Sequence, residues 1–139
     1  MLKLVKLTKE HIQNIDTEFT FNKSYRDDMC VQAVNGYAAL KGNDPIAIAG
    51  INSLWDGVAE GWIVIGKQSK SHRFAIAKTV KLMLQQMIND NNLFRLQASV
   101  CLKDEKAIRF TQWLNFTEEG IMRKFGPDGT DYMRYAWVK

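Results

Sequence analysis

The sequence has few of the residues that build disulfide frameworks and metal sites. Its two cysteines, Cys30 and Cys101, lie far apart in the chain, and no second pair accompanies them. Its two histidines, His11 and His72, have no metal-ligand spacing. We therefore expect no disulfide framework and no metal site, and we expect both thiols to be reduced and buried.

Long apolar runs are absent too. No apolar segment approaches the roughly 20 residues that a membrane-spanning helix needs, and residues 1–6 lack the continuous apolar stretch of a signal peptide. A folded core is nevertheless expected, because 46 % of the 139 residues are hydrophobic and four of them are Trp. We expect residues 1–139 to form one domain in a cytoplasmic or virion-type compartment.

Negative charge is in the minority. The chain has 19 Lys and Arg against 15 Asp and Glu, which gives a formal net charge of +4. Five of the basic residues gather in one stretch: Lys67, Lys70, Arg73, Lys78 and Lys81. This patch suits an anionic small molecule or nucleic acid, and binding to nucleic acid would depend steeply on salt. Because cations at a helix N-terminus oppose the helix dipole unless an anion is present, we weigh anion binding equally with a solvated helix start.

The first part of the chain predicts a strand and two helices. Alternating apolar residues over 2–7 indicate a strand, and Thr8 is a suitable N-cap for a short helix that carries Ile12 and Ile15. A second helix is predicted over 25–34, because Asn35 and Gly36 form a C-terminal stop after it.

Residues 36–66 predict a meander of three antiparallel strands. The strands are expected at 37–40, 46–54 and 58–65, with a turn at 42–45. The dipeptide Asp56-Gly57 predicts a type I′ hairpin turn. The last strand is apolar on successive residues and should be central and covered on both faces.

A polar turn over 67–73 leads from this strand into a long amphipathic helix. The run Asn89-Asp90-Asn91-Asn92 is expected to stop the helix, and its apolar stripe has spacings of three and four: Ile76, Val80, Met83, Leu84 and Met87. Residues 94–101 return as a strand. A strand, a crossover helix and a strand indicate a parallel pair joined by a right-handed connection.

The C-terminal part predicts a last helix and a hairpin. Asp104 is expected to cap the helix, and Asn115 to close it in a left-handed conformation. Strands over 118–125 and 132–138 flank a turn, and this exposed hairpin is a possible homodimer contact. The whole chain then has a mixed α/β (α+β) fold of about seven strands and four helices.

This order of elements resembles that of the GNAT acyltransferases over nearly the whole chain. Residues 104–116 look like the family pattern N-x-x-A-x-x-L-Y-x-x-x-G-F. Ala107 and Phe116 agree with it, Phe110 is an apolar replacement, and Asp104 keeps the capping role of the family's Asn. The resemblance implies a mostly antiparallel central sheet, with a parallel strand pair at the cofactor cleft.

The resemblance also implies where acetyl-CoA binds. In the family, the cofactor lies in an opening between the fourth and fifth strands, and its pyrophosphate binds a glycine-containing loop that aligns with 68–73 here. The implied contacts are Ile63, Val64 and Ile65 for the pantetheine arm and Gln68, Ser71, His72 and Arg73 for the pyrophosphate. The loop here lacks the glycines that let an anion approach backbone N–H groups closely, so the Arg73 and Ser71 side chains would supply contacts instead.

The catalytic residues match the family only in part. Glu60 is the only acid in the fourth strand, where many members carry the base that accepts a proton from an amine, so Glu60 is the candidate catalytic residue. A solvated or ion-paired strand-end carboxylate is the alternative interpretation of Glu60. The position of the family's acidic tyrosine carries Thr111, whose aliphatic hydroxyl titrates far too high for that role. For Cys101 we favour a structural thiol over a nucleophile.

Two functions therefore stay open. The first is an acetyl-CoA-dependent N-acyltransferase whose amine acceptor cannot be identified, although the polar segment 20–28 could border its site. The second is an inactive protein of the same fold that serves as a phage virion component or binds a host protein. Residues 122–132 resemble a run in small phage-encoded proteins of this layout.

Overall fold

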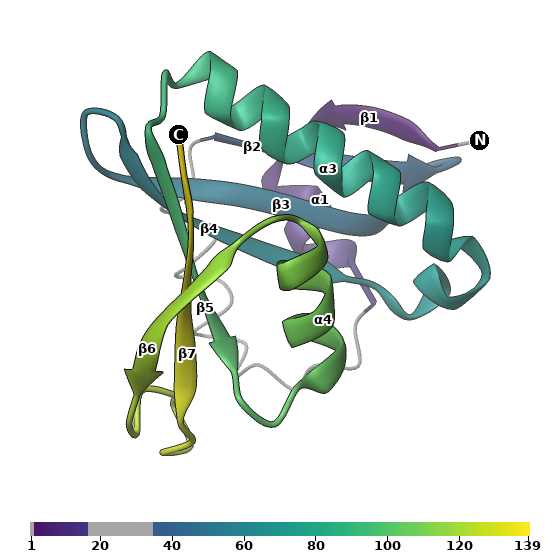
Figure 1. The fold of residues 1–139 in the computed structure, drawn as a ribbon. Coiled ribbons are helices and arrows are strands. Elements are labelled where there is room, and N and C mark those ends of the chain that lie inside the picture. Colours follow the sequence, from purple (N-terminus) through teal and green to yellow (C-terminus); the bar gives the residue numbers. More distant parts are fainter. Residues whose placement is uncertain (1, 17–34) are drawn as a thin grey trace. The chain divides into compact units, whose positions relative to one another are not determined.

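A computed structural model describes residues 2–16 and 35–139 of the chain (Figure 1). In these ranges the elements are β1 (Lys3–Lys6), α1 (Lys9–Asn14), β2 (Asn35–Lys41), β3 (Asp44–Trp55), β4 (Val58–Ile65), the 3-10 helix η1 (Lys67–His72), α3 (Arg73–Asp90), β5 (Arg95–Cys101), α4 (Glu105–Trp113), β6 (Thr117–Met122) and β7 (Tyr132–Val138). The seven strands form one sheet in the order β1-β2-β3-β4-β5-β7-β6. The predicted helix over 25–34 lies outside the described residues.

The sheet is mixed, as the sequence predicts. β4 and β5 pair in parallel, whereas β1 with β2, β2 with β3, β5 with β7 and β6 with β7 pair antiparallel. The parallel pair is joined by η1 and α3, which confirms the predicted crossover. The described part of the chain holds three α-helices where about four were expected.

By their internal packing, the described residues fall into two compact units. The first unit contains the described residues up to Asn52 together with Gly61–Asn91. The second contains Ser53–Glu60 and Asn92–Lys139. Strands β3 and β4 each contribute residues to both units.

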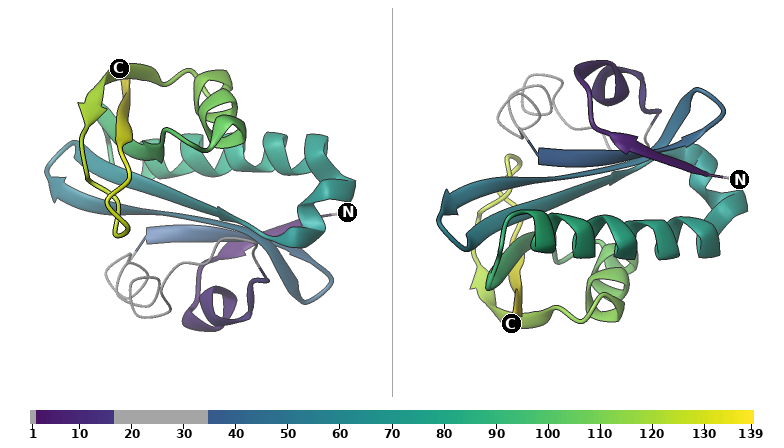
Figure 2. Two further views of the ribbon diagram at one scale, coloured as in Figure 1. Left: turned by 90° about the horizontal axis from the view of Figure 1, so that it is seen from below. Right: turned by 90° about the horizontal axis from the view of Figure 1, so that it is seen from above.

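The core of the first unit lies on both faces of its strands, with α1 and α3 on opposite faces (Figure 2). The predicted stripe of α3 is buried at all five positions: Ile76, Val80, Met83, Leu84 and Met87. On the α1 side, Ile12 and Ile15 pack with Ile48 and Val64. Because the strands are covered on both faces, their side chains are apolar on successive residues, as in 46–49 of β3.

The second unit covers only one face of its strands with a helix. Leu96 and Val100 of β5 are buried, and so are Leu114 and Phe116, which follow α4. Within α4 itself, residues Glu105–Trp113, no residue is buried. The alternate residues of β5 are half-buried and mostly polar, so this sheet has one apolar and one polar face.

The predicted helix ends are confirmed. Thr8 Oγ1 accepts a hydrogen bond from His11 N at 3.4 Å, and Asp104 Oδ1 accepts one from Ala107 N at 3.0 Å, as N-caps do. Asn115 has φ 69°, the left-handed conformation expected after α4.

Three local predictions are wrong. Only Gly57 (φ 84°) has a positive φ in the β3–β4 turn, so the turn is not type I′, which needs a positive φ at Asp56 as well. Residues 67–72 form a 3-10 helix where a turn was expected. Cys101 is half-buried, because it lies on the polar face of β5, near the end of the strand. Within the described ranges no helix is long and apolar enough to cross a membrane.

Candidate active site

β4 passes into η1 through a glycine that has no room for a side chain. Gly66 N donates to Ile46 O at 2.8 Å, and Lys67 N donates to Asp16 O at 2.7 Å. A Cβ atom on Gly66 would lie 3.0 Å from Asp16 O and 3.1 Å from Ile46 O. The two backbone bonds therefore fix the direction in which the chain leaves β4 and begins η1.

The segment expected to hold the pyrophosphate is compact and helical. Ser71 Oγ donates to Gln68 O at 3.2 Å, which is a hydrogen bond within the segment. None of residues 67–73 has a positive φ. Without glycine, the left-handed conformations of a phosphate-binding loop would be strained, so the chain winds into a 3-10 helix that continues directly into α3.

Two basic residues stand at the junction of η1 and α3. His72 is half-buried, and its buried Nε2 has no hydrogen-bond partner within the described residues. Arg73, the first residue of α3, is exposed, as are Gln68 and Ser71. The structure thus places the four predicted pyrophosphate contacts on one segment that leads into the α3 N-terminus.

The predicted pantetheine contacts lie in the last part of β4. The Val64 side chain is 4 % exposed and packs with Ile12, Ile15 and Ile48. Ile63 and Ile65 are half-buried. The Val64 side chain is committed to the core, so any contact that Val64 makes with a ligand would come from its backbone.

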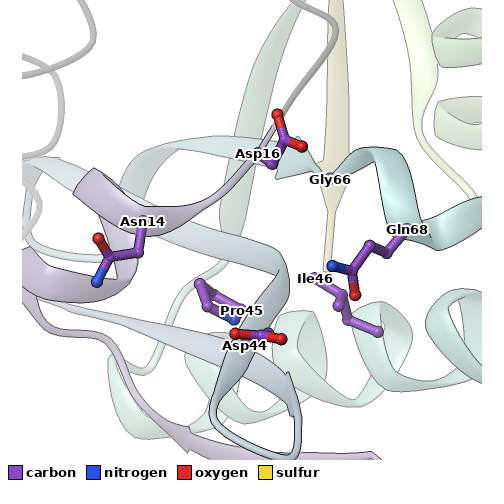
Figure 3. A pocket seen from close by; sticks show the side chains of 7 residues that line it. All are labelled: Asn14, Asp16, Asp44, Pro45, Ile46, Gly66 and Gln68. Carbon is purple, nitrogen blue, oxygen red and sulfur yellow. The ribbon is translucent and has the colours of Figure 1, made fainter.

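A small cavity of about 100 Å³ lies beside the start of η1 (Figure 3). It is lined by Asn14, Asp16, Asp44, Pro45, Ile46, Gly66 and Gln68. Ligand pockets usually enclose about 300–1,000 Å³. This cavity is therefore too small for a nucleotide, and the carboxylates of Asp16 and Asp44 oppose an anion there.

Glu60 belongs to the second unit and is bonded to two neighbouring strands. Its Oε1 accepts a hydrogen bond from Ser99 Oγ of β5 at 3.2 Å. The same oxygen forms an ion pair with Arg134 Nη1 of β7 at 2.5 Å. The Glu60 side chain is 34 % exposed. The structure therefore finds this carboxylate ion-paired with an arginine.

A second ion pair lies on the same sheet. Arg95 of β5 holds both oxygens of Glu119 of β6, at 2.6 and 3.0 Å, and its Nε also donates to Gln97. The hydrogen bonds from Arg95, followed by its charge and the charge of Arg134, lower the pKa of Glu119 below its ordinary value.

Sequence reasoning did not single out Ser99 and Arg134. The signal was present in β5, where Arg95, Gln97 and Ser99 alternate with the buried apolar residues. Arg134 required the register of β5 with β7, in which it stands opposite Ser99. Thr111, in the place of the family's tyrosine, donates its hydroxyl to Ala107 O at 2.7 Å.

Comparisons with known proteins support the fold and not one activity. No protein-family model matches the sequence, and no curated protein matches it either. Among solved structures, Ard1 from Thermoplasma volcanium superposes with a TM-score of 0.84 at 10 % identity, over 99 % of this chain and 97 % of that one. The ribosomal-protein-S18-alanine N-acetyltransferase from Escherichia coli superposes with a TM-score of 0.71 at 18 % identity, over 99 % of this chain and 94 % of that one.

A third similar structure names the fold family. It is a Desulfovibrio desulfuricans protein assigned to the GNAT acetyltransferases, with a TM-score of 0.75 at 14 % identity over 99 % of both chains. These matches cover nearly all of the chain and agree with the element order derived above. The chain therefore has the GNAT N-acetyltransferase fold.

Proposed function

We propose that this protein is an N-acyltransferase that moves the acetyl group of acetyl-CoA to an amine. The observation that carries the proposal is the order β4, η1, α3, β5 along the chain, within a fold shared with Ard1 over 97 % of that protein. The S18-alanine enzyme from Escherichia coli, by its name, acetylates an amine.

The strand pairing supports a cofactor site after Glu60. The parallel ladder covers three residues of each strand, Val58–Glu60 with Arg95–Gln97. β4 continues beyond this ladder to Ile65. In the proposal, the backbone of Ile63, Val64 and Ile65 pairs with the pantetheine arm of acetyl-CoA.

The residues at the start of α3 fit a pyrophosphate. The Nε2 of His72, which has no partner in the part of the chain that the structure describes, can donate to a phosphate oxygen in one tautomer, and the exposed Arg73 guanidinium can pair with a second one. An anion there would also offset the unfavourable placement of cations at a helix N-terminus. Gln68 and Ser71 complete the proposed contacts. Bound acetyl-CoA would supply the activated thioester.

Glu60 is the proposed general base. As the amine nitrogen bonds to the thioester carbon, its proton moves to the Glu60 carboxylate, directly or through a water. The C–S bond then breaks, and its electron pair leaves with the sulfur. The thiolate needs no acid from α4, because it can leave as an anion and take a proton from water. Thr111, on α4, donates its hydroxyl hydrogen bond to Ala107 O of the same helix.

Cofactor binding is the first test. At acetyl-CoA concentrations about 100 times the dissociation constant, binding stabilises the folded protein by about 2.7 kcal/mol, which a thermal shift detects. Arg73→Glu should abolish most of this shift. Lys78→Glu, the same charge change at another exposed position of α3, should reduce it much less. Equal losses in the two variants would refute the pyrophosphate site.

Turnover is the second test. Glu60→Gln should lower the rate of thiol release from acetyl-CoA by about 10²–10⁴-fold and leave the thermal shift intact. Loss of the shift would show that Glu60 is structural. The absence of any acetyl-CoA shift up to millimolar concentration would overturn the proposed enzyme and favour the inactive, partner-binding alternative.

A further inference from the structure

Half-buried polar side chains line one face of the sheet in the second unit. By the registers of β4 with β5 and of β5 with β7, Glu60, Gln97, Ser99 and Arg134 share this face. We call it the polar face. The other charged and titratable groups on it are Arg95, Cys101, Tyr132 and Glu119, the last joined to the face by its pair with Arg95.

Both bonds to the Glu60 carboxylate go to the same oxygen. Ser99 Oγ and Arg134 Nη1 each donate to Oε1, at 3.2 and 2.5 Å. No described residue donates to Oε2. An isolated carboxylate turns about its last torsion with little preference, whereas two donors from adjacent strands hold its plane. Among the described residues, therefore, Oε1 is held by two donors and Oε2 by none.

The Arg134–Glu60 pair differs from an ordinary surface ion pair. The two side chains are 22 % and 34 % exposed, whereas the ion pair of Lys67 with Asp16 is 51 % and 71 % exposed. Charge-assisted hydrogen bonds are shorter and stronger than neutral ones, and solvent screening weakens the exposed ion pairs most. Arg134 also faces the negative charge of Glu119, which is already neutralised by Arg95.

We propose that Arg134 is a positioning residue, which holds Oε1 of Glu60 so that Oε2 takes the proton of the acceptor amine. This inference rests on the proposed function. The amine N–H bond breaks toward Oε2, the nitrogen pair forms the new C–N bond, and the sulfur leaves with the C–S pair. Arg134 itself contacts neither substrate and exchanges no proton.

The Arg95–Glu119 pair offers a matched control on the same sheet. Arg134→Met removes the guanidinium that holds Glu60, and Arg95→Met removes a guanidinium of similar exposure that does not touch it. Arg134→Met should lower kcat by about 10- to 100-fold, the cost of a misplaced catalytic group. KM for acetyl-CoA should stay within about twofold, and Arg95→Met should change kcat by less than about twofold.

The assay follows thiol release from acetyl-CoA with three amines as probes: spermidine, a peptide with N-terminal alanine, and polylysine. Arg134→Lys should restore most of kcat, since one charged donor to Oε1 suffices. If Arg134 were merely structural, its loss would not lower kcat selectively while KM for acetyl-CoA stays unchanged, and the lysine variant would not restore kcat.

The outcomes separate this inference from the proposed function. An active wild type with an Arg134→Met variant of unchanged kcat overturns only the inference. If Arg134→Met fails to fold, Ser99→Ala removes the weaker donor alone and should lower kcat by a few-fold without moving KM for acetyl-CoA. Unchanged kcat in that variant counts against the inference, whereas a wild type that binds acetyl-CoA and acetylates none of the three probes counts against the proposed function.

Discussion

The two units of the molecule use ion pairs differently. In the first unit, Lys6–Asp90 and Lys67–Asp16 are separated by 4.0 and 3.7 Å, and their side chains are 40–76 % exposed. In the second unit, Arg95–Glu119 and Arg134–Glu60 lie at 2.6 and 2.5 Å with exposures of 22–40 %. Loosely paired surface charges contribute little to stability. The first unit therefore depends on its apolar core, and the second places close charge pairs on a sheet face.

This difference has a functional meaning. A core that is covered on both faces of a sheet provides a rigid frame, and no buried charged residue is found among the described residues. A half-buried face with paired charges can bind and orient polar molecules, because each charge keeps a fixed partner. Substitutions in the two units should therefore differ in the size and the kind of their effects.

The largest effect is expected in the core of the first unit. Met83 is 0 % exposed, so Met83→Ala should cost about 2–5 kcal/mol of unfolding free energy, through lost apolar burial and the cavity left behind. Leu82→Ala, one residue earlier on the exposed side of α3, should cost less than about 1 kcal/mol. Denaturant unfolding measures both. Equal losses would show that α3 is not the core helix of the unit.

The second effect concerns the β3–β4 turn of the second unit. Gly57 and Gly129 both have a positive φ, of 84° and 79°, so an alanine at either position costs about 1–2 kcal/mol in backbone strain. A Cβ on Gly57 would also overlap the Phe94 ring, whereas a Cβ on Gly129 meets nothing within 4 Å. Gly57→Ala should therefore destabilise more than Gly129→Ala.

A double variant separates the two causes. Phe94→Ala in the Gly57→Ala background should remove the overlap and leave only the strain, which brings the loss close to that of Gly129→Ala. The comparison is made by urea unfolding of the wild type, the single variants Gly57→Ala, Gly129→Ala and Phe94→Ala, and the double variant. If the double variant is as unstable as the sum of its single variants, the ring is not the obstacle.

The smallest effect is a pH dependence. The pKa of Glu119 is lowered by its hydrogen bonds to Arg95, so its contribution to stability is present above the ordinary carboxyl pKa of about 4.3. That contribution is lost as pH falls through the lower pKa of the folded state. Glu119→Gln should therefore reduce stability at neutral pH and flatten its decline toward acid.

The control for this prediction is Leu82→Ala, which changes no titrating group and should keep the wild-type pH dependence. High salt should weaken the contribution of Glu119 only in part, because the pair is partly shielded from solvent. A Glu119→Gln protein with the wild-type stability profile from pH 3 to 7 would mean that the pair contributes nothing to folding.

Local sequence patterns predicted the frame of the molecule well. The apolar stripe of α3 can be recognised because its positions repeat every three or four residues. The two ends of α4 follow from Asp104 and Asn115, by capping rules that involve only near neighbours in the chain. The β4–β5 crossover follows from a strand, a helix and a strand in order. These features depend on contacts that are local in the chain or on topology with few alternatives.

The site was less predictable because it depends on register. Glu60 and Arg134 are 74 residues apart, and the sequence around each residue does not indicate that the other is its partner. Their contact needs the parallel register of β4 with β5 and the antiparallel register of β5 with β7 at once. The 3-10 helix η1 was also missed, because glycine-free polar residues fit a turn and a 3-10 helix equally well.

The register shift in β6 has a consequence for how the protein behaves in concentrated solution. β6 is the last strand of the sheet, and Glu119 is an extra residue between Glu118 and Gly120 that has no counterpart on β7. The irregularity and the two carboxylates interrupt the row of backbone groups that an incoming strand would copy. Open-ended growth of the sheet into fibrils is thereby discouraged at an edge where nearly every residue faces water.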